Sequence, residues 1–356
     1  MLRRTRRAPT AFSARARLPH MAKSVSIKDI ARAAGVHHST VSRALKGQRR
    51  INHETAARIR RIAVDAGFTV SAVARSLATQ RTAMIGVVVT TITDPFHHEI
   101  IAGLDDVATE NNYSVIVADS QGDPERELKV VRSFHERRVD AIVVLSSRVG
   151  ACYMSLLTER RVPIVLVNNQ RRHAAVHAVT IDNVDASSVA VQHLLDLGHR
   201  RIGYIGNENG VYSDTERLAG YRQALTDADL IFSPDLVQHA DNSPEGGSRA
   251  MTRLLDLPEP PTAVFCYNDM MALGAYHATR GRVTVPRDVS IVGFDDLFFS
   301  RFLDPPLTTT AQPKKQMGRK AMEVALALLN GEPMERTVHI KGELMVRSST
   351  AAPSRL

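Results

Sequence analysis

Small polar side chains and one arginine follow each other closely in the N-terminal part of the chain. These candidates are His38, Ser39, Thr40, Ser42 and Arg43. On a short helix they fall on or beside the exposed side, and such a helix fits the DNA major groove, where these groups reach base edges and phosphates. The simpler alternative is an ordinary helical hairpin whose polar face is solvated.

Two predicted helices position these side chains. Ser26 precedes the first helix, with Asp29 three residues later, which is a capping-box pattern. Gly35 supplies the turn, because a residue without Cβ reverses the chain direction at little cost. In the second helix Val41 and Leu45 point inward. The spacing therefore predicts a helix-turn-helix unit.

Positive charge is concentrated at this end of the chain. Residues 1–80 contain 17 lysines and arginines but only three acidic residues, a net charge of +14, whereas the whole chain carries +9 and the remainder therefore −5. A third helix, capped by Asn52, places further arginines on its outer side. This asymmetry is typical of a nucleic-acid-binding head on a sensor or an enzyme.

A second group of polar residues recurs where apolar, β-branched runs end. From Met84 onward these runs alternate with amphipathic stretches in two series, which predicts βαβ units and two doubly wound parallel sheets. The polar ends are Thr90–Asp94, Asp119–Asp123, Asn168–Asn169, Asn268–Asp269 and Asp295–Asp296. Strand caps and turn formers explain some of them. Because ligands in such folds bind beyond the carboxyl ends of the strands, we expect a cleft between two lobes.

No catalytic or metal-binding constellation accompanies these residues. The sequence lacks a GxSxG elbow, a P-loop, an HExxH motif and a suitably placed GxGxxG. His37–His38 and His97–His98 are adjacent pairs, which do not share a helix face as metal ligands do. Asp295–Asp296 has no nucleophile beside it, so ligand hydrogen bonding is its simpler role. We expect no enzyme activity, no metal and no cofactor.

The cysteines and the hydropathy indicate the compartment. Cys152 and Cys266 lie far apart and form no CxxC pair, which fits a reducing cytoplasm. No apolar run is long enough to span a membrane, so we expect a cytoplasmic protein without membrane contact. Residues 1–20 hold six arginines and no acidic residue, and are expected to be a disordered basic arm or a mis-assigned start.

Longer motifs occur in order from Val25 to Ser349. They are IKDIARAAGV, STVSRAL, ARSLATQRT, IGVVV, DPF, RRVDAIVV, HLLDLGHRRIGYIG, RLAGYRQAL, PTAVFCYNDMMALGA, VPRDVSIVGFDD and PPLTTTAQP. These motifs resemble the LacI/GalR family of bacterial transcriptional regulators. The resemblance implies an all-α helix-turn-helix head and an α/β core of two lobes like periplasmic sugar-binding proteins. It also implies a homodimer on a near-palindromic double-stranded DNA operator, with an effector between the lobes that changes DNA affinity.

The resemblance also assigns DNA contacts to single residues. His38 and Ser39 match positions that touch base edges, while Thr40, Ser42 and Arg43 match backbone and base contacts. Ala74 and Leu77 lie in the segment that would form a hinge helix, with Leu77 as a wedge in the minor groove. His37 departs from the family, which usually has serine there, and Val70–Ser71 replaces the common Pro-Asn start of the hinge.

The effector contacts follow from the same resemblance. The matching positions are Asp94, Phe96, Asn168, Arg217, Asn268, Asp295 and Gln312. An arginine with carboxylates and amides suits the hydroxyls of a sugar, and an aromatic ring suits its face. Selectivity is expected from residues at the lobe edges, namely Thr91, Tyr212, Asp241 and Phe298. The implied effector is a sugar or a related metabolite.

The expected organisation has five parts. These are the arm (1–20), the helix-turn-helix domain (21–70), the hinge helix (71–82), the core (83–349) and a tail (350–356). The first lobe of the core is expected at about 83–180 and 313–341, and the second at about 181–312 and 342–349. Leucine heptads are absent near the C-terminus, which favours a dimer over a tetramer. Two alternatives remain: a solute-binding protein without a DNA role, and an enzyme on the same scaffold.

Overall fold

The computed structural model describes residues 25–45, 51–68, 76, 80–149, 162–168, 176–209 and 212–354. The chain forms two compact units, which fall in residues 1–75 and 76–356. The predicted basic arm and the predicted hinge contacts Ala74 and Leu77 lie outside the described residues. None of the helices in the described ranges has the length and hydrophobicity that crossing a bilayer requires.

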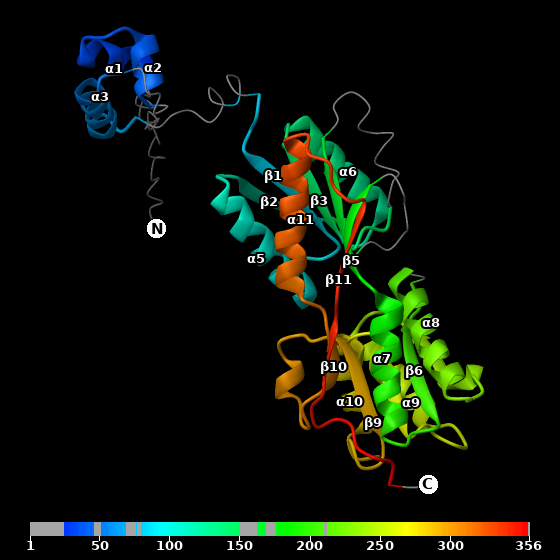
Figure 1. Ribbon diagram of the computed structural model, residues 1–356. Coiled ribbons are helices and arrows are strands. Elements are labelled where there is room, and N and C mark those ends of the chain that lie inside the picture. The colour runs from blue at the N-terminus through cyan, green and yellow to red at the C-terminus, as the bar shows by residue number, and fades with distance from the viewer. Residues whose placement is uncertain are drawn as a thin grey trace, which may run out of the picture. The chain divides into compact units, whose positions relative to one another are not determined.

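The first unit contains three short helices (Figure 1). They are α1 (Ile27–Ala34), α2 (His38–Leu45) and α3 (His53–Asp65). The predicted capping box is confirmed, since Ser26 Oγ accepts from the Asp29 amide and the Asp29 carboxylate accepts from the Ser26 amide. Gly35 ends α1 in the left-handed conformation, at φ 63°. Buried side chains from all three helices, Ile30 and Ile59 among them, form one apolar cluster.

The first lobe of the second unit is built on a parallel sheet in the order β11-β5-β4-β3-β1-β2. Its strands are β1 (Met84–Val89), β2 (Ser114–Asp119), β3 (Ala141–Leu145), β4 (Ile164–Val167), β5 (His177–Ile181) and β11 (Thr337–Ile340). The helices α5 (Pro95–Glu110) and α11 (Lys314–Leu329) cover one face, and α6 (Pro124–Glu136) covers the other. Val87 packs with the former and Val88 with the latter, as alternation along a strand requires.

The second lobe repeats this plan with the order β12-β10-β9-β8-β6-β7. Its strands are β6 (Ile202–Asn207), β7 (Val237–Ala240), β8 (Ala263–Cys266), β9 (Ser290–Asp295), β10 (Thr308–Ala311) and β12 (Glu343–Met345). Helices α7 (Asn183–Asp196) and α8 (Tyr212–Asp227) cover one face, and α9 (Pro244–Leu255) and α10 (Asp269–Thr279) cover the other. Short 3₁₀ helices form at Pro234–Leu236 and Ser300–Phe302. The predicted doubly wound sheets are thus confirmed, except that β12 pairs antiparallel with β10.

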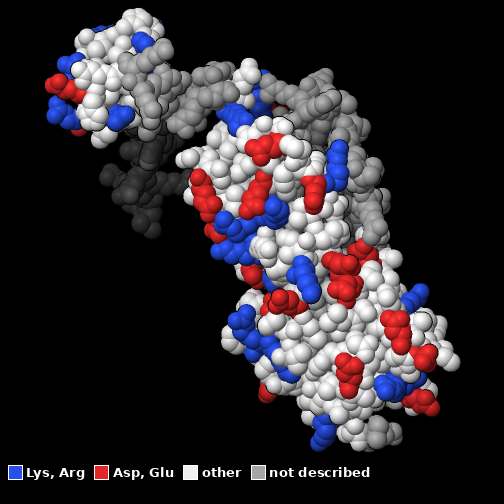
Figure 2. Space-filling model, in the orientation of Figure 1, with Lys and Arg blue, Asp and Glu red and all other residues white. Residues whose placement is uncertain are grey.

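The chain passes between the lobes three times, from β5 to α7, from β10 to α11 and from β11 to β12 (Figure 1). All strands but β12 are parallel within their sheets, so their carboxyl ends gather at one edge of each sheet. Figure 2 shows acidic and basic side chains interspersed over the visible face of this unit, without a large area of one sign.

Candidate functional site

A cavity of about 70 Å³ lies where strand ends of the two sheets meet. The first lobe lines it with Thr90, Asp94, Phe96, Ser146, Arg148 and Asn168, and the second with Asn207, Arg217, Asn242, Tyr267, Asn268 and Asp295. A larger hollow of about 920 Å³ lies over α9 and α10, on helices and loops of the second lobe alone. We assign the functional site to the small cavity, because only there do buried polar groups of both lobes converge.

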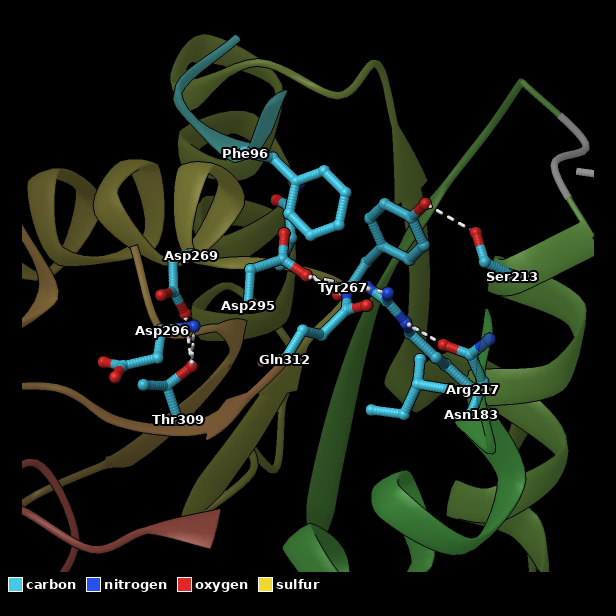
Figure 3. Close-up of polar contacts among 12 residues, drawn as sticks. Phe96, Asn183, Ser213, Arg217, Tyr267, Asp269, Asp295, Asp296, Thr309 and Gln312 are labelled. Atoms are coloured by element: carbon cyan, nitrogen blue, oxygen red, sulfur yellow. Dashed lines mark hydrogen bonds and ion pairs between the residues drawn. The ribbon is translucent and has the colours of Figure 1, made fainter. Parts of the chain in front are cut away.

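Six of the seven predicted effector contacts line this cavity. The seventh, Gln312, is only 2% exposed and lies behind Asp295, to which its Nε2 donates a hydrogen bond of 2.7 Å. Gln312 therefore acts on the cavity through Asp295 in this arrangement. Figure 3 shows Phe96 projecting toward the side chains of Asp295 and Tyr267.

Several lining residues were not among the predicted contacts. They are Thr90, Ser146, Arg148, Asn207, Asn242 and Tyr267. Each ends a strand or follows one closely, so the position of polar residues just after apolar runs was the signal that could have identified them.

The predicted selectivity residues Thr91, Tyr212, Asp241 and Phe298 do not line the cavity, and their role in selectivity stays a prediction. The Asp241 carboxylate turns instead to Arg249, at 2.6 Å, and to the Ser243 hydroxyl. The Phe298 ring is 56% exposed and packs edge-on against Phe299.

Arg217 of α8 is the most firmly held polar side chain of the cavity. Its Nε donates to Asn183 Oδ1 at 3.0 Å, and its Nη1 donates to the Tyr267 carbonyl at 2.5 Å. Its guanidinium carbon lies 3.6 Å from the centre of the Phe294 ring, a cation–π contact. Nη2 lies 3.7 Å from Asp295 Oδ1, so a buried ion pair faces the cavity (Figure 3).

Burial controls the ionisation of Asp295. Desolvation raises its pKa to about 6, although the nearby Arg217 guanidinium and the Gln312 hydrogen bond favour the charged form. Repulsion from the Asp94 carboxylate of the first lobe contributes to this rise in pKa. The carboxylate of Asp295 is thus an acceptor whose charge depends on pH in the physiological range.

A second buried carboxylate, Asp269, connects several segments next to Asp295. It accepts hydrogen bonds from the Leu297 amide at 2.7 Å, from Ser300 Oγ at 2.6 Å and from Thr309 Oγ1 at 2.6 Å. Burial and the charge of Asp295 raise its pKa to about 7. Asp269 therefore joins α10, β10 and the segment after β9 into one network (Figure 3).

Left-handed backbone recurs at the strand ends that form the cavity. Ser146, Asn168, Asp295 and Asp296 have φ values of 54°, 51°, 107° and 47° although none is glycine. Each such residue costs on the order of 1–2 kcal/mol, so the surrounding contacts must over-determine it. Strain of this kind is typical of binding sites.

Some of the polar residues at strand ends are helix caps, as the simpler interpretation predicts. Asp94 lines the cavity and also caps α5, accepting from the Phe96 amide at 2.9 Å. Asn268 caps α10 through the Met271 amide, at 3.0 Å. Asp123 caps α6 without lining the cavity.

The helix α2 presents the predicted DNA-contacting residues. His38 and Arg43 are exposed, whereas Ser39, Thr40 and Ser42 are half-buried. His37 takes the place of the usual serine: its Nδ1 lies 2.9 Å from Ser39 Oγ and 3.4 Å from the Ser39 amide. The imidazole thus caps the start of α2.

The adjacent histidines of α5 lie in different surroundings. His97 is buried, with Nδ1 3.1 Å from the Thr91 carbonyl, whereas His98 is exposed. Across the described ranges, histidine, cysteine and acidic residues form no group that could hold a metal ion.

Comparison with known proteins relates both units to one family. A model described as bacterial regulatory proteins, lacI family, matches residues 26–71, and a periplasmic binding protein-like domain matches residues 191–350. The HTH-type transcriptional repressor CytR of Escherichia coli (strain K12) is 36% identical over 333 residues, covering 92% of this chain and 97% of CytR.

Two solved structures show the same similarity in three dimensions. A lac repressor dimer bound to operator and the anti-inducer ONPF is 25% identical, with a TM-score of 0.84, covering 93% of this chain and 100% of that chain. A regulator from Enterococcus faecium with bound ribose is also 25% identical, with a TM-score of 0.68, covering 76% of this chain and 99% of that chain.

Proposed function

Because the chain belongs to the lacI family of bacterial regulatory proteins, we propose that it is a DNA-binding transcriptional repressor controlled by a small effector. It binds a near-palindromic operator as a homodimer, in the cytoplasm, and a sugar or related metabolite in the cavity changes its DNA affinity. The lac repressor structure supports the dimer and the operator, and the ribose complex supports a sugar. The named relatives are regulators rather than enzymes, and a solute-binding role alone leaves the helix-turn-helix unit without a purpose.

The observation that carries this proposal is the buried pair Arg217–Asp295 on a cavity lined by both lobes. The guanidinium donates and the carboxylate accepts, so together they fit two neighbouring hydroxyl groups. The Asn268 amide lines the same wall, and the Phe96 ring of the first lobe offers an apolar face for a sugar ring.

The DNA contacts are proposed for α2 and the hinge segment. His38 and Arg43 are exposed and reach base edges and phosphates, while Ser39, Thr40 and Ser42 contribute shorter contacts. Ala74 and Leu77 belong to the proposed hinge helix, in which Leu77 opens a base step of the minor groove.

Effector and operator are coupled through the arrangement of the two lobes. An effector that contacts both walls of the cavity favours the arrangement in which both walls reach it. It shifts DNA affinity only by its differential affinity for the two arrangements.

The test is a footprinting and mobility-shift experiment with the full chain on the DNA that adjoins its own coding region. We expect protection of a near-palindromic site, with affinity that falls steeply as salt rises. A panel of pentoses, hexoses, disaccharides and nucleosides, starting with D-ribose, should contain a compound that changes this affinity. A protein that prefers no genomic sequence over random duplex refutes the proposal.

A pair of variants tests the proposed reading helix. Arg43→Ala should reduce the preference for the protected site over random duplex at least tenfold, which corresponds to about 1.4 kcal/mol. Arg32→Ala is the control, because Arg32 is an exposed arginine of α1 with a side-chain exposure of 82%. It should leave that preference unchanged.

A further inference from the structure

We propose that Lys314 is a positioning residue, which holds the turn Asp295–Asp296 at the cavity and joins it to α5 of the first lobe. The proposal rests on the proposed function, since it concerns how the effector carboxylate Asp295 is presented.

Lys314 is the first residue of α11, and it is 3% exposed. Its Nζ donates to the Asp295 carbonyl at 2.6 Å and to the Asp296 carbonyl at 2.9 Å, and it lies 3.4 Å from Glu99 Oε1. An ammonium group has three N–H donors. The two carbonyls accept hydrogen bonds from two of them, and the Glu99 carboxylate compensates the charge of the buried cation.

The turn that Lys314 holds is strained. Asp295 and Asp296 adopt φ values of 107° and 47° in succession. Two adjacent carbonyls that point to one side come close to each other, and a cation between them offsets their repulsion. Without the ammonium group, the left-handed conformation loses the contact that favours it over the ordinary extended backbone.

The same turn has contacts in both lobes. In the second lobe, Arg347 Nη2 donates to Asp296 Oδ1 at 2.6 Å, and the Leu297 amide donates to Asp269. On the first-lobe side, the Leu297 side chain is buried in the apolar cluster formed by α5 and α11. A shift of the turn is therefore felt by both lobes.

Glu99 completes the link to the cavity wall of the first lobe. It lies in α5, whose first turn carries Phe96 and is capped by Asp94. Lys314 thus connects the backbone of the second-lobe carboxylate, Asp295, to the helix that presents the first-lobe contacts. A movement of Asp295 that an effector causes is therefore transmitted to α5 through Lys314, in addition to the apolar contact of Leu297.

The neighbouring residue provides a matched control. Lys315 lies one residue later in α11 and also pairs with α5, at 2.9 Å from Asp106 Oδ2. Its side chain is 61% exposed, and the cavity lining does not include it. Lys314→Met and Lys315→Met remove the same charge and keep a similar chain length, but only the first removes the hold on the turn.

The experiment is hydrogen–deuterium exchange of the full chain, followed by mass spectrometry of peptides that cover residues 293–300. We expect exchange at this turn to be at least tenfold faster in Lys314→Met than in the wild type, and unchanged in Lys315→Met. Glu99→Gln should accelerate exchange less than Lys314→Met does. Peptides from α9 report whether each variant is folded. Unchanged exchange at the turn in a folded Lys314→Met protein, or equal effects of the two lysine variants, would overturn the proposal.

A second measurement separates this proposal from the proposed function. In isothermal titration with D-ribose or the first compound of the panel that binds the wild type, Lys314→Met should weaken affinity at least tenfold and Lys315→Met less than twofold. Equal affinities of Lys314→Met and wild type contradict the positioning role. If the wild type binds no compound, the effector part of the proposed function fails, whereas the exchange comparison still decides the role of Lys314.

Discussion

The two walls of the cavity are built differently. On the second lobe, Arg217, Asn268 and Asp295 are at most 6% exposed, and hydrogen bonds fix each of them. On the first lobe, Asp94 and Arg148 are half-buried. The second lobe therefore offers a group of buried, hydrogen-bonded side chains. The first lobe also buries Phe96 and Asn168, at 6% and 7% exposure, and adds the more accessible Asp94 and Arg148.

This difference indicates a division of labour. A preorganised wall loses little conformational entropy on binding, so it supplies most of the affinity. The more accessible side chains of the first lobe become ordered only when the effector binds, so their contacts depend on whether the cavity is occupied by effector. We expect variants of the buried second-lobe residues to affect stability and affinity together, and a variant of the half-buried Arg148 in the first lobe to affect mainly affinity.

The largest effect is expected for Arg217→Met. Methionine keeps packing against Phe294 but leaves Asp295 buried without its cation, which should cost about 3 kcal/mol of unfolding free energy. Urea unfolding measures this loss, and titration with the effector should show that binding is abolished.

The control for that prediction is an exposed ion pair of the same lobe. Arg249 and Asp241 lie only 2.6 Å apart, yet their side chains are 57% and 44% exposed. Because water screens such pairs, Arg249→Met should cost less than about 0.5 kcal/mol. Equal losses in the two variants would remove the distinction between a buried and a screened pair.

The pH dependence of stability should come next in size. The pKa of Asp269 is raised to about 7 in the folded protein, above its ordinary value of 3.8, so its ionisation opposes folding. The stability that protonated Asp269 provides is fully present below about pH 4 and is lost as pH rises through 7. Asp269→Asn cannot ionise, so its stability relative to the wild type should rise by about 2 kcal/mol between about pH 5.5 and pH 8.

The difference in stability between Asp269→Asn and the wild type removes the contribution of groups whose pH dependence runs in the opposite direction. Burial lowers the pKa of His193 and His199, so these imidazoles destabilise the fold as pH falls. They are present in both proteins and cancel in the difference. Parallel pH profiles of urea unfolding for the two proteins would contradict the prediction.

Whether a residue of the cavity could be predicted depends on its position in the sequence. Asp94 and Asn268 were predicted from the family resemblance, because they lie in the motifs DPF and PTAVFCYNDMMALGA, and each of them also caps a helix. Arg148 and Asn242 lie outside those motifs, in the loops after β3 and β7, and tertiary contacts decide which side chains of such a loop reach the cavity. Glu127, for example, is buried and accepts from the Arg148 amide at 3.2 Å, a contact across 21 residues of sequence.

The fold was easier to predict from the sequence than the site, except for two strands with polar sequences. Long β-branched runs such as β1 and β3 predicted the central strands of the first sheet. The strands β10 and β12 carry the sequences TTTA and ELM, which hydropathy does not distinguish from a loop. β10 is a strand because Thr308, Thr309 and Thr310 are buried beside β9, which only the assembled sheet determines.

A smaller effect is expected at Asp94 on the first lobe. Asp94→Ala removes the cap of α5 and should cost about 1 kcal/mol of unfolding free energy. Asp123→Ala is the matched control, because Asp123 caps α6 of the same lobe by accepting from the Glu125 amide at 2.8 Å but does not line the cavity.

Both variants should lose stability equally in urea unfolding, while only Asp94→Ala weakens effector binding. Equal affinities of the two variants would mean that Asp94 serves the helix alone.

The smallest effect on stability is expected at Arg148. Its side chain is half-buried and packs beside the backbone of Gly122, so Arg148→Ala should change the unfolding free energy by no more than about 0.5 kcal/mol. It lines the cavity, however, and its guanidinium contributes donors that an effector can use. Titration should therefore show weaker binding without a change in the urea midpoint, the reverse of the coupled loss expected for Arg217. If Arg148→Ala lowers stability as much as Arg217→Met does, the first lobe is as rigid as the second and the two walls do not differ in kind.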